Sequence, residues 1–158
     1  MQEQKNSLGC FLCGVENPHG MKLSWFSDFE QGLVWTEVEV APYYNGYPGV
    51  THGGIVAALL DETSFRAIAL EEKERFLTDD RMFVTGSLHI HYHKPTPTGQ
   101  PLRVVGWIKR TGSKRYETLA EIRLPDGTVT ASCRALIMKP ADDFGGRSCF
   151  PSDEPLDD

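Results

Sequence analysis

One carboxylate stands on a segment whose other side chains are mostly apolar. Every residue from Ile55 to Leu60 is apolar, Asp61 follows directly, and apolar residues resume at Phe65. A helix that is apolar on nearly all sides is normally buried, and a buried carboxylate is costly unless it is paired or takes part in chemistry. Asp61 is therefore a candidate general base or nucleophile. The alternative is a buried polar pair that holds two helices or two subunits together.

A pair of glycines opens the same segment. His52-Gly53-Gly54 precedes the apolar run, and the first N–H groups of a helix lack partners and carry a partial positive charge. Because glycine has no side chain, a ligand oxygen can approach this backbone closely, so Gly53 and Gly54 could form an oxyanion hole. The alternative is a tight turn in which the glycines serve packing alone. His52 could orient this turn through its ring.

These two features are too far apart for one helix to serve one carbonyl group. Gly53 and Asp61 are separated by roughly 12 Å along a helix that rises about 1.5 Å per residue. An attacked carbonyl carbon must lie about 3 Å from both its oxyanion donor and the water held by the base. Two antiparallel helices in a dimer could meet this requirement, with Gly53 from one chain and Asp61 from the other. If Asp61 is catalytic, we expect two shared active sites in a dimer.

Two groups of residues have the types that bind metals. Cys10-x-x-Cys13 looks like half of a zinc site, but no second pair follows at a fitting spacing. Because zinc needs four ligands, we expect no metal there. His89, His91 and His93 share one face of a predicted strand, which could bind a metal or, more simply, form an exposed polar face.

A basic hairpin stands out in an otherwise acidic chain. Four cations surround the predicted turn at Thr111–Ser113, and they are Lys109, Arg110, Lys114 and Arg115. Such a cluster could contact a phosphate group. The alternative is a solvated turn without a ligand.

Composition limits the class of protein. The chain has 158 residues, of which 40% are apolar and 24% charged, which suits one globular domain. Its net charge of −6, without a long basic run, argues against nucleic acid or an anionic membrane as the main partner. No apolar run approaches the roughly 20 residues of a membrane span, and residues 1–6 lack the pattern of a signal peptide. We therefore expect a cytoplasmic protein.

Alternating apolar and polar residues predict most of the fold. The expected strands cover residues 22–29, 32–41, 83–94, 102–110, 115–124 and 128–138. A helix should run from Gly53 toward Arg75, while residues 1–9 should be loose. We expect an α+β fold over residues 1–140, in which a curled antiparallel sheet of about six strands wraps one long helix, followed by a poorly ordered acidic tail at 141–158. The uncovered sheet edge and outer face point to a dimer.

The stretch from Asn45 to Glu62 resembles the hotdog-fold acyl-CoA thioesterases, in the branch like the phenylacetate-pathway enzyme PaaI. It is similar to the family pattern of His-Gly-Gly followed by a helix with an acid nine residues after the His. The opening Cys10-Phe-x-Cys-Gly-x-x-Asn-Pro-x-Gly20 is similar to a start common in one subgroup. The strand from Leu88 that ends in Lys94-Pro95 also resembles the family, and the likeness runs from Cys10 to Met138.

The resemblance implies hydrolysis of acyl-CoA thioesters to a free acid and coenzyme A, with no separate cofactor. Asp61 would activate water or attack the thioester. The Gly53 N–H would polarise the carbonyl, with Asn45 and His52 close to it. Thr85 would help to hold the water, although it shares strand parity with the His triplet, so a bulge or a dimer-facing surface is needed for it to reach the site.

The same resemblance implies where the substrate binds and how the chains assemble. The positions expected to contact coenzyme A are Gly54, Arg110, Lys114 and Arg115. We expect a homodimer with shared sites, which could pair into a tetramer. A binding protein that senses acyl-CoA without turnover is the main alternative, and hydration of an enoyl thioester is another. The sequence does not define the acyl group.

Overall fold

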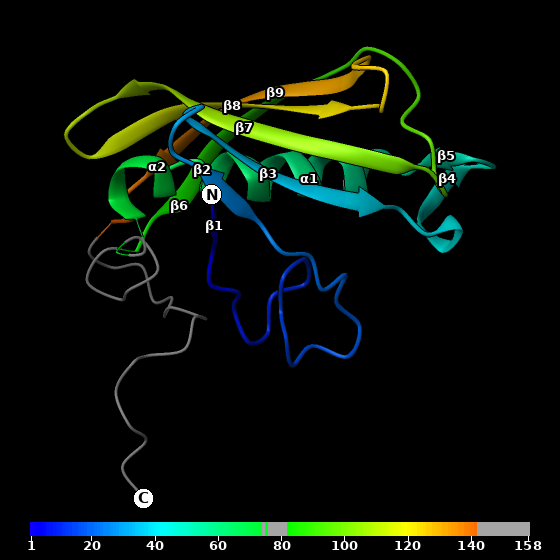
Figure 1. The fold of residues 1–158 in the computed structure, drawn as a ribbon, viewed down its shortest axis with the longest axis horizontal. Helices are drawn as coiled ribbons and strands as arrows, with labels where there is room; N and C mark the ends of the chain where they lie inside the picture. Colours follow the sequence, from blue (N-terminus) through cyan, green and yellow to red (C-terminus); the bar gives the residue numbers. More distant parts are fainter. Residues whose placement is uncertain (74, 76–81, 142–158) are drawn as a thin grey trace, which may run out of the picture.

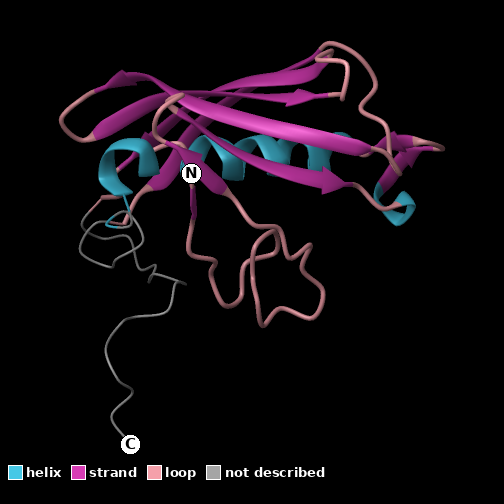
Figure 2. Ribbon diagram, viewed as in Figure 1, coloured by secondary structure: helices cyan, strands magenta, loops and turns pink. Residues whose placement is uncertain are grey.

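A computed structural model describes residues 1–73, 75 and 82–141, and it shows one long helix lying against a large antiparallel sheet (Figures 1 and 2). The helix is α1, Gly53–Arg66. The sheet has seven strands in the order β1-β2-β3-β7-β8-β9-β6. Their bounds are Gln2–Glu3, Phe26–Asp28, Leu33–Glu39, Pro101–Thr111, Arg115–Arg123, Val129–Met138 and Val84–Tyr92, in that order. The expected α+β hotdog arrangement is confirmed.

Smaller elements join these parts. A 3₁₀ turn at Pro42–Tyr44 leads into a separate two-stranded sheet of β4, Asn45–Tyr47, and β5, Val50–Thr51. A short helix α2, Ala69–Glu72, follows α1. The continuous helix expected as far as Arg75 is therefore wrong, because the chain turns after Arg66 and buries Ile68 and Ala69 in a second apolar cluster.

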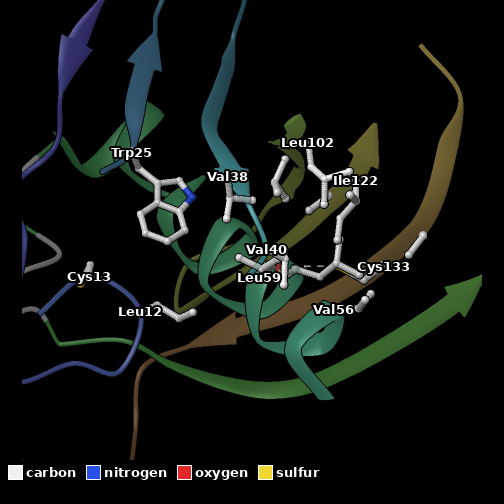
Figure 3. Packing of buried hydrophobic residues seen from close by; sticks show 14 residues of the cluster. Leu12, Cys13, Trp25, Val38, Val40, Val56, Leu59, Leu102, Ile122 and Cys133 are labelled. Atoms are coloured by element: carbon white, nitrogen blue, oxygen red, sulfur yellow. Dashed lines mark hydrogen bonds between the residues drawn. The ribbon is translucent and has the colours of Figure 1, made fainter. Parts of the chain in front are cut away.

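The core lies between α1 and the inner face of the sheet. Val56, Leu59 and Leu60 of α1 pack against alternating strand residues such as Val104 and Ile122. Figure 3 labels Val56 and Leu59 on α1 and Ile122 on the sheet as members of this cluster. Each fully buried aliphatic side chain of this kind contributes about 1.5–3 kcal/mol relative to exposure. This packing fixes the position of α1, and hence that of Asp61, against the sheet.

The N-terminal segment covers α1 on the side away from the sheet (Figure 1). Leu12 and Cys13 belong to the buried core cluster. The side chain of Gln4 donates to the Arg66 carbonyl at 3.3 Å and to Ser27 Oγ at 3.0 Å. The expectation that residues 1–9 are loose is therefore wrong, because their polar side chains are tied to α1 and β2.

One further expectation concerns the C-terminal end of the fold. The expected acidic tail at 141–158 lies, except for residue 141, outside the described residues. Among the described residues, no helix is long and apolar enough to cross a membrane.

Candidate active site

His52 organises the start of α1. It is the N-cap residue, and its ring Nδ1 accepts the Gly54 N–H at 2.9 Å. Its carbonyl accepts the N–H groups of Ile55 and Val56 at 2.9 and 3.1 Å. Within the described chain, no acceptor takes the Gly53 N–H. The two glycines are therefore not equivalent, since Gly54 is engaged by the cap while Gly53 retains its donor for a ligand.

Tyr92 also lies beside this turn, a position that no motif in the sequence indicated. Its hydroxyl donates to the Gly53 carbonyl at 3.0 Å. A Cβ placed on Gly53 would lie 3.6 Å from the tyrosine ring. The end of β6 therefore lies against the start of α1. No local pattern could have shown this, because it depends on how a distant strand aligns with the helix.

Asp61 lies two turns further along α1 and is half-buried. Its Oδ1 is inaccessible to solvent, and no donor in the described part of the chain bonds to it. A buried acceptor without a partner costs about 1–3 kcal/mol. A donor from a substrate, a water molecule or a second chain would remove that cost.

Asn45 lies at the edge of the His52 turn. In the β4–β5 pair it stands opposite Thr51, the residue before His52. The backbone bond from the His52 N–H to the Tyr44 carbonyl, at 2.9 Å, holds the two segments together. The side-chain Oδ1 of Asn45 is also buried without a donor among the described residues. The structure thus brings Asn45, His52 and Gly53 to one end of α1.

A β-bulge decides which way Thr85 points. Thr85 pairs with Ile137, while Leu88 pairs with Ala135, and the register shifts between Thr85 and Ser87. Paired residues of neighbouring strands share a face, and both partners are buried on the helix side. Thr85 therefore lies on the face of β6 that is turned toward α1, although its position in the sequence alternates in step with the His triplet. The role expected for Thr85 required a bulge of this kind.

The His triplet lies on the outer face of β6. His89, His91 and His93 are exposed, and the His93 ring bonds to Ser132 Oγ at 2.7 Å. Near the triplet, the outer face of the sheet has a hollow of about 450 Å³, lined by His89, His91, Trp107, Leu119, Ala120, Glu121, Ser132, Cys133 and Arg134. This hollow lies on the opposite side of the sheet from α1, so it does not coincide with the Asp61 site.

The basic hairpin lies at the other end of α1 from the glycine turn (Figure 1). Thr111 at its base donates to Glu71 of α2 at 2.6 Å. Glu117 takes up part of the charge, because Lys109 lies 3.0 Å from it and Arg134 3.5 Å. Within one chain, the exposed cations Arg110, Lys114 and Arg115 are therefore not brought together with Gly54.

Glu62 is largely buried and belongs to an ion pair, although it directly follows Asp61 on α1. Its side chain is only 17% exposed and pairs with the fully buried Arg66 at 2.8 Å. Burial raises the pKa of Glu62, and the Arg66 charge opposes that rise. The Cys10 and Cys13 thiols lie next to this pair. A hydrogen bond from Cys10 lowers the pKa of Cys13 to about 5, with a smaller contribution from Arg66.

The chain is similar to several known proteins. The chain resembles the structure of a thioesterase superfamily protein at 29% identity and a TM-score of 0.71, over 82% of this chain and 62% of that one, so it spans less than two thirds of that relative. The Escherichia coli PaaI protein of the phenylacetic acid degradation operon shares 18% identity over 68% of this chain and 76% of its own, with a TM-score of 0.57. A Streptococcus mutans protein bound to acetyl-CoA shares 22% sequence identity, over 68% of this chain and 80% of its own, with a TM-score of 0.55.

The last two likenesses support the fold alone. A search of curated proteins found no match. A family model named thioesterase superfamily matches residues 48–131, which is more than half of the chain and contains the His52–Asp61 segment and Thr85. The chain therefore belongs to the thioesterase superfamily.

Proposed function

We propose that this protein hydrolyses acyl-CoA thioesters in active sites shared between two chains. The observation that carries this is the pair of unfilled polar groups on α1, the Gly53 N–H at its start and the buried Asp61 Oδ1 two turns later. Family membership supports thioester hydrolysis. The acetyl-CoA bound to one structural relative supports a coenzyme A thioester as the substrate.

The pattern of α1 supports the shared site. Gly53, Ala57 and Asp61 are spaced four residues apart, so each lies only about 40° around the helix from the last, and the three form one stripe. If a second α1 packs antiparallel with the two-fold axis at Ala57, the Gly53 of one chain lies level with the partner's Asp61. The small side chains at 53 and 57 permit a close approach.

The sheet offers a surface for the same dimer. In the described chain, β6 bonds only to β9, so its other edge is open. Leu88 and Ile90 on this strand are only half-buried. An open strand edge with partly exposed apolar residues is suited to pairing with a second chain. The same edge ends at Tyr92, beside the Gly53 turn.

The chemistry follows from these positions. The thioester carbonyl oxygen accepts the Gly53 N–H, and the helix N-terminus stabilises the negative charge that this oxygen gains as the carbon becomes tetrahedral. In one route, the partner's Asp61 takes a proton from the attacking water, which Thr85 helps to hold. In the other route, Asp61 attacks the carbonyl carbon itself, and water then hydrolyses the acyl-enzyme to release the acid. The carbon–sulfur bond breaks, coenzyme A leaves as the thiol, and the acyl group leaves as the acid.

Replacement of Asp61 by Asn tests this proposal. Asp61→Asn keeps the size of the side chain and removes its basicity, so thiol release from a panel of acyl-CoA and aryl-CoA substrates should fall at least about a hundredfold. Asp126→Asn in the exposed β8–β9 turn is the matched control and should keep full activity. Unchanged turnover in Asp61→Asn would exclude its catalytic role. Thermal stabilisation of the wild type by acyl-CoA without any thiol release would support the sensing alternative.

A further inference from the structure

We propose that Cys10, Cys13 and Glu62 bind a zinc ion between the N-terminal segment and α1. One sulfur atom of each cysteine and one carboxylate oxygen of Glu62 lie within 4.8 Å of one another. Thiolates and carboxylates are zinc ligands, and C-x-x-C is a usual spacing for two of them. Glu62 and Asp61 are about 100° apart around α1, so this site is separate from the proposed thioesterase site.

The backbone around Cys10 is shaped to hold its sulfur. The Leu12 N–H donates to Cys10 Sγ at 3.3 Å, and the Gly14 N–H donates to the Cys10 carbonyl at 2.9 Å. A Cβ on Gly14 would lie 2.3 Å from that carbonyl oxygen, so the tight turn requires glycine. Donors in the outer shell of a metal site orient the ligands and tune the metal. The Cys10–Gly14 turn therefore directs a backbone N–H group at the Cys10 sulfur, as the loops of metal sites do.

The rest of this loop is held in place by its own polar groups. Lys22 Nζ donates to the carbonyls of Gly14, Val15 and Asn17 at 3.2, 3.0 and 2.7 Å. Ser7 Oγ accepts the Cys10 N–H at 3.0 Å and lies 3.6 Å from Cys13 Sγ. A site held by its surroundings before the ion arrives binds more tightly than one that must be ordered. These bonds therefore hold the loop that carries both cysteines in one conformation.

Glu62 is held toward the thiols by Arg66. Arg66 Nε donates to Glu62 Oε1 at 2.8 Å, and its Nη1 donates to Gln4 Oε1 and to the Lys5 carbonyl at 3.2 and 3.0 Å. Because the ion pair uses Oε1, the carboxylate keeps Oε2 as a ligand atom. Two thiolates and one carboxylate balance the charges of Zn²⁺ and the buried Arg66, so the loaded site is electrically neutral.

The fourth zinc ligand is a water molecule. Sites with three protein ligands complete their coordination in this way. Cys13 is 1% exposed, whereas Cys10 is half-buried, so water and the ion reach the site from the Cys10 side. The sequence alone led us to expect no metal because the third ligand lies on a helix far along the chain.

Metal analysis of the full-length, untagged protein tests this inference. Protein purified with a thiol reductant and no chelator should contain about one zinc per chain. After removal of the zinc, Co²⁺ should give the thiolate-to-metal absorption band of a sulfur-ligated site. Cys13→Ser should abolish the band, and Glu62→Gln should weaken cobalt binding at least about tenfold. Cys133→Ser, which changes a buried thiol bonded to Ser64, should leave both unchanged.

Several results would overturn the zinc site. Absence of zinc together with no cobalt band in the wild-type protein would do so, as would a band that persists in Cys13→Ser. Detection of a Cys10–Cys13 disulfide instead of bound metal in the reductant-treated protein would also exclude the site. Glu62→Gln keeps the readout valid if either serine variant fails to fold, because it changes no thiol and its circular dichroism can be compared with the wild type.

Discussion

Gly106 of β7 lies directly against Thr63 of α1. A Cβ placed on Gly106 would be 2.9 Å from the Thr63 carbonyl oxygen and 3.0 Å from its Cγ2. The central strand therefore touches the backbone of the helix, and no side chain fits between them. This contact sets how deeply α1 sits in the sheet.

Replacement of Gly106 by Ala should destabilise the fold. The added methyl group must push α1 away from β7 or distort both, which costs about 1–3 kcal/mol. Urea unfolding measures this as a lower midpoint with an unchanged slope. Gly9→Ala, where a Cβ would meet nothing within 4 Å, should change the free energy of unfolding by less than about 0.5 kcal/mol. Equal stability of the two variants would show that the sheet and α1 are less closely packed than described.

The buried bond between Trp25 and Thr63 leads to a second expectation. Trp25 Nε1 donates to Thr63 Oγ1 at 3.0 Å, and Thr63 in turn donates to the Leu59 carbonyl at 2.7 Å. Thr63→Val keeps the shape but leaves the indole N–H buried without a partner, which costs about 1–3 kcal/mol. Thr128→Val, on a half-buried turn, is the control for the chemical change. If thermal unfolding shows the same loss in both variants, the bond to Trp25 is not what stabilises the protein.

Tyr92 should support catalysis without supporting stability. Tyr92→Phe removes the hydrogen bond to the Gly53 carbonyl. Because the Gly53 peptide then loses part of its orientation toward the substrate, kcat should fall about two- to tenfold. The residue is 57% exposed, so the melting temperature should hardly change. Tyr47→Phe, at another exposed tyrosine, should have full activity. An equal loss in both variants would contradict the positioning role.

The proposed shared active site predicts a particular dimer interface. Ala57→Arg places a charge at the proposed crossing of the two helices, and an unpaired buried charge costs several kcal/mol. The dimer dissociation constant, measured by analytical ultracentrifugation, should rise at least about a hundredfold, and thiol release should fall with it. Gln31→Arg, on an exposed turn, should leave the dimer intact. A monomeric wild type, or a dimer unaffected by Ala57→Arg, would exclude this arrangement of the helices.

Strands with a strict period of two could be predicted from the sequence. In β8 the inward residues Tyr116, Thr118, Ala120 and Ile122 are all buried, as their alternation indicated. The same rule failed for Thr85, because one extra residue at the bulge exchanges the two faces of β6. It also missed β1, which is too short to show a period and forms only by pairing with β2.

Some residues of the candidate site could likewise be predicted from the sequence, and others could not. Asp61 and the His52–Gly54 turn are recognisable because their chemistry and spacing are local. Tyr92 and Glu62 are not, because their roles depend on which distant segments reach them. The contribution that we propose for a second chain leaves no direct mark on one sequence, and the geometry of α1 only indicates where it would be needed.

The attachment of the N-terminal segment to α1 affects how the protein is made. Gln4 bonds to Arg66, 62 positions later, and Leu12 packs in a core that includes Leu59 and Leu60. During synthesis these early residues emerge from the ribosome well before their partners. The nascent chain therefore exposes apolar side chains and unpaired polar groups near its N-terminus until the helix has left the exit tunnel. At this stage the chain is most prone to aggregation and most in need of chaperones.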